Sequence, residues 1–274
     1  MTVVVVPYHQ DQRLPGELLP LPLPPRGDYL VLDSHLTDGL VLDSHLPDGQ
    51  SGAGPVDDIW ARLVTLDDAA ADQIAAAVRA GSPATVVSGD CLVALATVAG
   101  VQRAGLDPAL IWLDAHGDVH TLETTTSGYL GGLSLRLALG AHPERLSSLG
   151  LRPIAEDRVV LVDARDLDPP EAAWLAGSAV RRRTVADLDA GALPGGPLVL
   201  HVDVDVIDPG ELPGLLFPAP GGPSTESVLA AVGRVLATGR VVALDIACPW
   251  HPSQDGRVQQ IRARLLAALL TAFS

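Results

Sequence analysis

The segment Leu110-Ile111-Trp112-Leu113-Asp114-Ala115-His116-Gly117-Asp118 joins a short apolar run to a cluster of polar side chains. The apolar part predicts a buried β-strand over residues 110–113. A second segment, Leu198-Val199-Leu200-His201-Val202-Asp203-Val204-Asp205, has the same design and predicts a strand over 198–202. Apolar strands of this kind are typical of a parallel sheet that is covered on both faces.

Similar apolar runs alternate with helical patterns along the rest of the chain. We expect further strands at 2–6, 84–87, 159–162 and 241–246, and helices at 66–79, 91–104, 224–237 and 256–273. This alternation predicts an α/β fold, with a central, mostly parallel sheet between two layers of helices. No break in composition divides the chain, so we expect one domain over residues 1–274.

Residues 7–55 do not follow the alternation. They contain a Pro-rich stretch at 19–25 and a near-repeat, in which the pattern of residues 30–36 returns at 40–46. The repeat is too short for a solenoid. We expect a loop-rich insertion or flap, with His35 and His45 on its surface.

The composition excludes several classes of function. The chain has 274 residues, 47% of them hydrophobic, and a formal net charge of −15, which disfavours a nucleic-acid partner. All 18 basic residues are arginines, so neither a Schiff-base lysine nor a Walker A lysine is present. We find neither a signal-peptide pattern nor an apolar run of about 20 residues that could span a membrane. We therefore expect a soluble cytoplasmic protein with Cys91 and Cys248 as free thiols.

Aspartates follow several of the expected strands. Asp90, Asp114, Asp166, Asp203 and Asp245 each come directly after an apolar run. Open α/β sheets bind their ligands outside the carboxyl ends of the strands. We therefore expect these side chains to converge on one edge of the sheet.

The spacing of Asp114, His116 and Asp118 indicates a metal site. Alternate residues of an extended chain project to the same side, and carboxylates and imidazoles suit divalent Mn, Fe or Zn. Alone, the pattern fits structural capping aspartates equally well. Asp203 and Asp205 repeat the spacing, and such like charges repel one another unless a cation or a proton intervenes. Two such runs favour a shared site for two metal ions, whereas Asp208, which precedes a proline, is expected to form a turn.

Together with Ser88-Gly89-Asp90-Cys91, Thr124–Gly128, Arg165–Pro169 and Leu244-Asp245-Ile246, these motifs resemble the arginase/agmatinase (ureohydrolase) superfamily. The resemblance runs in the family's order from about Thr85 to the end of the chain. It implies an arginase-like three-layer α/β/α fold and two Mn²⁺ ions, bridged by a hydroxide that attacks the carbon of a guanidine.

The resemblance also implies roles for individual residues. Asp114 and Asp203 would bridge both metal ions. Cys91 and Asp118 would complete the coordination of one ion, and His116 and Asp205 that of the other. Asp118 would in addition hydrogen-bond the attacking hydroxide as a catalytic residue.

The chain departs from the family pattern at three positions. Cys91 stands where the family has a histidine ligand, and its softer, anionic thiolate leaves Fe²⁺ or Zn²⁺ open beside Mn²⁺. The alternative is a small buried cysteine with no metal bond. Gly131 replaces the proton-shuttle histidine of arginases, and Cys248 replaces a glutamate that pairs with the guanidinium of the substrate. A neutral thiol cannot pair with a cation as a carboxylate does.

The residues that would hold the amino-acid end of the substrate are retained. Thr125, Ser127, Asp166 and Asp168 match the family, and His120 stands in place of an asparagine. This match favours an α-amino acid over agmatine, while the loss of the glutamate and the shuttle favours a less basic, N-hydroxylated guanidine. The pattern is similar to that of family members that hydrolyse Nω-hydroxy-L-arginine to hydroxyurea and L-ornithine in D-cycloserine biosynthesis.

Two alternatives stay open, namely an ordinary arginase or other guanidino-acid ureohydrolase, and a catalytically silent metal-binding regulator. Candidates for protonating the leaving nitrogen are His120, His251 and Cys248. Arginase trimers use a tail beyond the last helix, whereas this chain ends directly after its expected final helix, so we expect a monomer.

Overall fold

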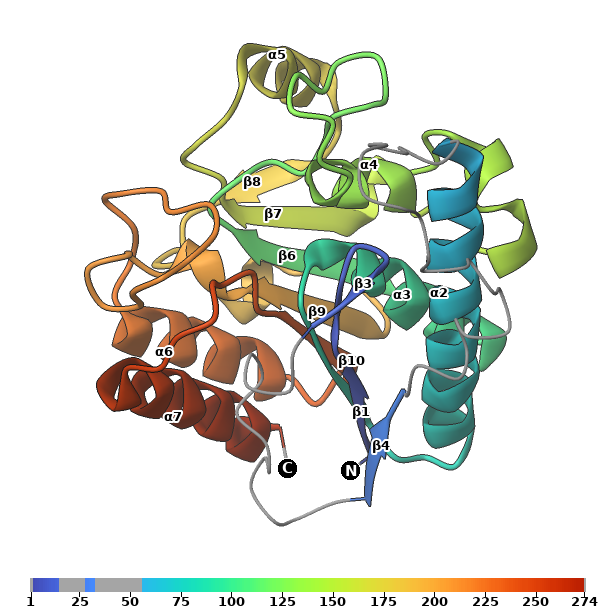
Figure 1. Ribbon diagram of the computed structural model, residues 1–274. Helices are drawn as coiled ribbons and strands as arrows, with labels where there is room; N and C mark the ends of the chain where they lie inside the picture. The colour runs from blue at the N-terminus through green and yellow to red at the C-terminus, as the bar shows by residue number, and fades with distance from the viewer. Residues whose placement is uncertain (1, 15–27, 33–55, 274) are drawn as a thin grey trace, which may run out of the picture.

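The computed structural model describes residues 2–14, 28–32 and 56–273. Within them, the centre of the molecule is an eight-stranded sheet with the order β4-β1-β5-β10-β9-β6-β7-β8, in which every pairing is parallel (Figure 1). Its strands are β1 (Thr2–Val6), β4 (Asp28–Val31), β5 (Ala84–Ser88), β6 (Ala109–Asp114), β7 (Val159–Asp163), β8 (Arg181–Arg183), β9 (Leu198–Asp203) and β10 (Val241–Ala247). A separate antiparallel pair consists of β2 (Tyr8–His9) and β3 (Gln12–Arg13). The expected α/β fold with a mostly parallel sheet is confirmed.

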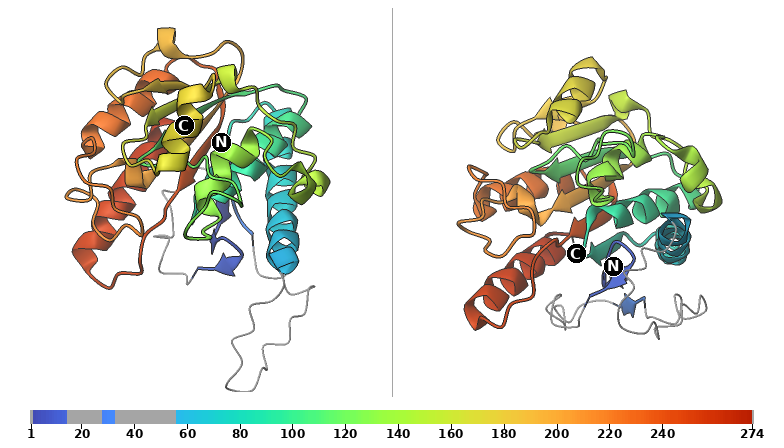
Figure 2. Two further views of the ribbon diagram at one scale, coloured as in Figure 1. Left: turned by 90° about the horizontal axis from the view of Figure 1, so that it is seen from above. Right: turned by 45° about the horizontal axis from the view of Figure 1, so that its top comes forward.

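Helices cover both faces of the sheet. One face carries α2 (Val56–Arg79), α3 (Ala94–Arg103) and α4 (Ser134–Ala138), and the other carries α6 (Thr225–Leu236) and α7 (Gly256–Ala272), as Figures 1 and 2 show. A further helix, α5 (Pro169–Gly177), follows β7. Short 3₁₀ turns complete the chain: Cys91–Val93, Gly131–Leu133, Pro143–Arg145, Ser147–Leu149, Glu156–Arg158, Ala190–Ala192 and Val204–Val206.

The strands divide their side chains between two apolar cores. Leu110 and Trp112 of β6 pack into the core under α2 and α3, while Ile111 and Leu113 pack into the core under α6 and α7. Because both faces are covered, every residue of β6 is buried, as its continuous apolar sequence predicts. Among the described residues, no helix combines the length and the apolar character that a membrane crossing requires.

Some boundaries differ from those expected. Helix α2 begins at Val56, ten residues before the expected start at 66. The edge strands β4 and β8 were not predicted, and β8 consists of three arginines, which carry no apolar signal. Strand β4 lies within the segment expected to be loop-rich. His35, His45 and most of the near-repeat lie outside the described residues, so the flap stays a prediction.

The predicted polar edge forms at the carboxyl ends of the strands. Asp114 and Asp203 end β6 and β9, and Asp90 and Asp166 follow β5 and β7 within three residues. The prediction was wrong for Asp245, which lies inside β10 with a fully buried side chain. The reason is that β10 continues past Asp245 to Ala247, one residue beyond the expected strand end at 246, so Asp245 lies within the strand and not after it.

Candidate active site

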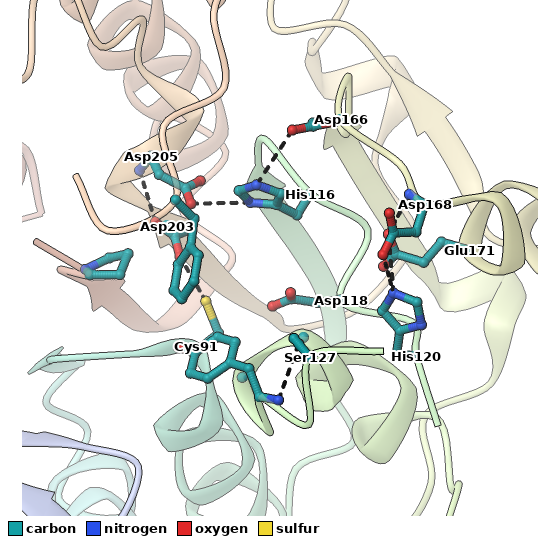
Figure 3. Close-up of a pocket in the computed structure, with 15 residues that line it drawn as sticks. Cys91, His116, Asp118, His120, Ser127, Asp166, Asp168, Glu171, Asp203 and Asp205 are labelled. Carbon is teal, nitrogen blue, oxygen red and sulfur yellow. Dashed lines mark hydrogen bonds and ion pairs between the residues drawn. The ribbon is translucent and has the colours of Figure 1, made fainter. Parts of the chain in front are cut away.

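A cavity of ≈ 230 Å³ opens at this edge of the sheet (Figure 3). Its walls come from the loops after β5, β6, β7, β9 and β10, from the first turn of α5, and from the 3₁₀ turns Cys91–Val93, Gly131–Leu133 and Val204–Val206. They consist of Cys91, His116, Asp118, His120, Ser127, Tyr129, Gly131, Gly132, Asp166, Asp168, Glu171, Asp203, Asp205, Phe217 and Pro249. Most of these polar residues were selected from the sequence.

Turns in the backbone, and not an extended strand, bring the polar side chains together. After Asp114 the chain leaves β6, its side chain accepts a hydrogen bond from the backbone N–H of His116 (2.7 Å), and Asp118 adopts a φ of 52°. Asp203 likewise accepts from the backbone N–H of Asp205 (2.8 Å) as a 3₁₀ turn begins. The side chains converge as predicted, but not for the predicted reason. They are brought together by turns and not by the alternation of side chains along an extended strand.

One cluster of possible ligand atoms contains Asp114, His116 and Asp205. Their ligand atoms lie within 4.8 Å of one another. The Nδ1 atom of His116 is 3.1 Å from Oδ2 of Asp205 and 3.4 Å from Oδ1 of Asp114, and Figure 3 shows the imidazole directed at Asp205. Burial alone would lower the pKa of His116, but the two carboxylates raise it to about 12. Burial and the charge of Asp114 raise the pKa of Asp205 to about 6.

A second cluster contains Cys91, Asp114 and His201, again with ligand atoms within 4.8 Å of one another. Both cysteines of the chain are free and buried. The thiol of Cys91 donates a hydrogen bond to Oδ2 of Asp203, with 2.8 Å between the sulfur and the oxygen. Burial raises the pKa of the Cys91 thiol, and the carboxylates of Asp203 and Asp118 raise it further. Without a cation, Cys91 is therefore a protonated donor.

The donor set fits a pair of divalent cations. The two clusters share Asp114, which is the arrangement that a bridging carboxylate requires. The Oδ2 atom of Asp118 is buried and has no hydrogen-bond partner among the described residues. Burial, with the charges of neighbouring carboxylates, raises the pKa values of Asp118 and Asp203, as expected where acids crowd without a counter-charge. The six predicted ligands are therefore gathered around one site, and their metal bonds stay a prediction.

The predicted substrate contacts divide into two groups. His120, Ser127, Asp166 and Asp168 line the cavity, and Nε2 of His120 is 3.1 Å from Oδ2 of Asp168. Thr125 does not line it but supports its wall, because the Thr125 hydroxyl accepts a hydrogen bond from the backbone N–H of Gly128 (3.1 Å).

Cys248 does not line the cavity, so the structure does not support its expected contact with substrate. Its side chain lies on the same side of the extended chain as those of Leu244 and Ile246, in the core under α6 and α7. Its neighbour Pro249 reaches the cavity instead. Of the three proton-donor candidates, His120 lines the cavity, Cys248 is buried beside it and His251 is exposed.

Tyr129 is a cavity residue that the sequence analysis missed. A Cβ atom on Gly131 would lie only 2.3 Å from Cζ and 2.4 Å from the hydroxyl oxygen of Tyr129. The tyrosine ring therefore occupies the space into which a side chain at position 131 would extend. The ring also stacks on His9 (centroids 5.3 Å apart) and contacts Phe217 (4.7 Å). A large aromatic residue two positions before an unexpected glycine was the available signal.

Glu171 is a second missed residue, and it organises the loop after β6. Its Oε1 accepts a hydrogen bond from the backbone N–H of Val119 (3.2 Å), and its Oε2 accepts from that of Asp168 (3.1 Å). A Cβ on Gly117 would lie 2.8 Å from Oε1, so glycine is needed there for this approach. The spacing of Asp168 and Glu171 at the start of α5 is a capping-box signature that could have identified it.

Comparisons with known proteins identify the family of the chain and structures with a similar fold. A sequence pattern that describes the arginase family matches residues 53–273. The chain is 31% identical over 215 residues to a Streptomyces lavendulae protein named N(omega)-hydroxy-L-arginine amidinohydrolase, with 77% of this chain and 75% of that protein covered. It is 35% identical over 162 residues to a Bacillus subtilis arginase, with 53% of this chain and 54% of that arginase covered. The fold is similar to that of an Entamoeba histolytica arginase solved with L-ornithine (TM-score 0.78, 20% identity, 98% and 97% of the two chains covered).

The protonation of the site predicts that metal binding depends on pH. The raised pKa values keep the Cys91 thiol and the His116 imidazolium protonated at neutral pH in the metal-free protein. Both groups must lose a proton before they can bind a metal, so full loading should release at least two protons per chain near pH 7. Isothermal titration with Mn²⁺ in buffers of different ionisation enthalpy measures this number, and the affinity should rise with pH. Binding without proton release would contradict the assignment.

Proposed function

The chain belongs to the arginase family, whose hydrolases act on guanidino C–N bonds, and we propose that its substrate is Nω-hydroxy-L-arginine, which it cleaves to hydroxyurea and L-ornithine. The observation that carries this proposal is at Gly131. Glycine has no side chain, and the neutral phenol of Tyr129 occupies the space into which a side chain at this position would extend. Support comes from the name of the Streptomyces lavendulae relative.

The lining of the cavity suits the amino-acid end of such a substrate. Asp166 and Asp168 present partly exposed carboxylates, which can accept hydrogen bonds from an α-ammonium group. The Ser127 hydroxyl lines the cavity, 3.5 Å from the Thr125 hydroxyl, and can donate to an α-carboxylate. These contacts favour an α-amino acid over a simple amine.

The other end of the cavity suits a guanidine that carries no charge. An N-hydroxyl group withdraws electrons and makes the guanidine less basic, so a carboxylate partner is not needed. Burial and the carboxylate of Asp90 raise the pKa of Tyr129, so its phenol stays protonated. A protonated phenol can donate a hydrogen bond to the hydroxylated end of the substrate. A charged guanidinium has only N–H donors, so it would be a poor acceptor for this hydrogen bond.

The reaction adds one water to the substrate. The bond from the guanidine carbon to the side-chain nitrogen breaks, this nitrogen takes up a proton and leaves as the amine of L-ornithine, and the oxygen of water becomes the carbonyl oxygen of hydroxyurea. Cys91, Asp114, His116, Asp118, Asp203 and Asp205 would hold two divalent ions. Such ions, when bound, lower the pKa of water and offset the negative charge that develops in the transition state.

The residues of the chain then divide the remaining work. Asp118, with an unpaired buried oxygen, would accept the proton of the attacking water. His120, held by Asp168, is the one of the three predicted proton donors that lines this cavity. We further propose that the metal is Mn²⁺ and that the protein has a role in D-cycloserine biosynthesis. We also propose that it is a cytoplasmic monomer without nucleic-acid or membrane partners.

A direct assay of products tests the proposed substrate. The metal-loaded protein is incubated with Nω-hydroxy-L-arginine or L-arginine, and hydroxyurea, urea and ornithine are quantified by mass spectrometry. We expect kcat/KM for the hydroxylated substrate to exceed that for L-arginine by about tenfold or more. Preferred release of urea from L-arginine would instead identify an arginase, and a metal-loaded protein without turnover would identify the silent regulator.

The role of the Tyr129 hydroxyl is tested by removing it. Tyr129→Phe keeps the ring in the space beside Gly131 but loses the donor, so kcat/KM for Nω-hydroxy-L-arginine should fall about tenfold, the effect of one hydrogen bond. Tyr8→Phe is the matched control, because the Tyr8 hydroxyl is buried, lacks a partner among the described residues and does not line the cavity. Equal activity of the two variants would show that the phenol makes no such contact.

A further inference from the structure

His201 is a buried histidine to which neither the sequence nor the family resemblance assigned a role. It lies in β9, two residues before Asp203, and its side chain is 0% exposed. Its ring stacks on Trp112 with the centroids 3.7 Å apart. Its Nδ1 lies 2.6 Å from Oδ2 of Asp245. The stacking and the hydrogen bond together fix the orientation of the imidazole.

The second nitrogen of this ring is the unexplained atom. Nε2 of His201 has no hydrogen-bond partner among the described residues. Leaving a buried polar atom unpaired is energetically unfavourable. Where the carboxylate of Asp245 accepts a hydrogen bond from Nδ1, the lone pair of a neutral ring lies on Nε2. That lone pair requires a proton donor or a metal ion.

The neighbours of Nε2 are themselves potential ligands. The sulfur of Cys91, a carboxylate oxygen of Asp114 and a ring nitrogen of His201 lie within 4.8 Å of one another, and Nε2 is the ring nitrogen that Asp245 leaves unpaired. Bonds of about 2.0–2.3 Å to one ion place ligand atoms at such separations. The thiol of Cys91 is committed to Asp203 in this structure, so it does not supply the missing partner.

The environment of His201 also matches that of a metal-bound histidine. Such a histidine almost always donates its other N–H to a carboxylate, which fixes the tautomer and makes the ligand more basic. Asp245 provides this contact and is held in turn by the Thr97 hydroxyl (3.2 Å), inside the core. The position of Asp245 within β10, instead of at the edge of the sheet, is explained by this task.

We propose that Nε2 of His201 is a direct ligand of the metal ion on the Cys91 side of the site. The inference rests on the proposed metal centre but not on the proposed substrate. The chain lacks the family histidine at position 91, which follows β5. A neutral imidazole from β9, two strands away in the sheet, would supply a nitrogen ligand to the same ion. It adds a donor atom without adding charge to a site already crowded with a thiol and carboxylates.

Nuclear magnetic resonance of the cobalt protein tests the proposal without substrate. Protein labelled with ¹³C and ¹⁵N at histidine only is loaded with two Co²⁺ ions per chain. A directly bound imidazole shows far larger paramagnetic shifts than a nearby, unbound ring. We expect two such rings in the native protein, those of His116 and His201. Detection of the His116 ring alone would overturn the proposal.

Variants assign the two rings. His116→Gln should leave one strongly shifted ring, which keeps the test valid if His201→Gln does not fold. His201→Gln should lose that second ring and weaken Co²⁺ binding at the Cys91 side by about tenfold or more. His142→Gln is the control, since His142 pairs with Glu123 and Glu144 and does not line the cavity. Two shifted rings that both persist in His201→Gln would also overturn the proposal. Failure of the substrate assay would leave this result unaffected.

Discussion

The central constraint on this molecule is the repulsion among carboxylates that the fold buries together. Asp114 and Asp203 end strands β6 and β9, which are hydrogen-bonded neighbours in the sheet, and Asp118 and Asp205 follow within four residues. Unit charges 4 Å apart repel by about 4 kcal/mol at a dielectric constant near 20. A parallel sheet that is apolar on both faces does not solvate these carboxylates. Their repulsion is therefore reduced by protonation, by the His116 imidazolium or by metal ions.

The surrounding loops hold this cluster open instead of letting it rearrange. Arg165 reaches from the loop after β7 and donates to the backbone carbonyls of Val206 (3.0 Å) and Ala219 (2.7 Å). Asp208 accepts from the backbone N–H groups of Gly210, Gly221 and Gly222, which confirms its expected role in a turn. These contacts and those of Glu171 use backbone groups of the loops. They shape the cavity together with Asp114 and Asp203, whose side chains also accept backbone hydrogen bonds.

The sequence predicted those features that depend on short, repeated patterns. Continuous apolar runs located the buried strands, and aspartates after β6 and β9 located the site. Features that depend on contacts between distant segments were missed. Strand β8 consists of arginines that pair at an edge, Tyr129 enters a space left by Gly131, and His201 meets Cys91 across about 110 positions of sequence. Cys248 directly follows β10, and its family position alone does not reveal that its side chain packs into the core under α6 and α7.

The proposed hydrolysis requires two metal ions that share Asp114. Native mass spectrometry of the chain titrated with Mn²⁺ tests this most directly, because it counts the ions bound to each molecule. We expect two ions per native chain. In Asp114→Asn the binding of both ions should be markedly weaker, since this carboxylate belongs to both ligand clusters. A native chain that binds no ion, or a variant that loses one ion and keeps the other at full affinity, would contradict this expectation.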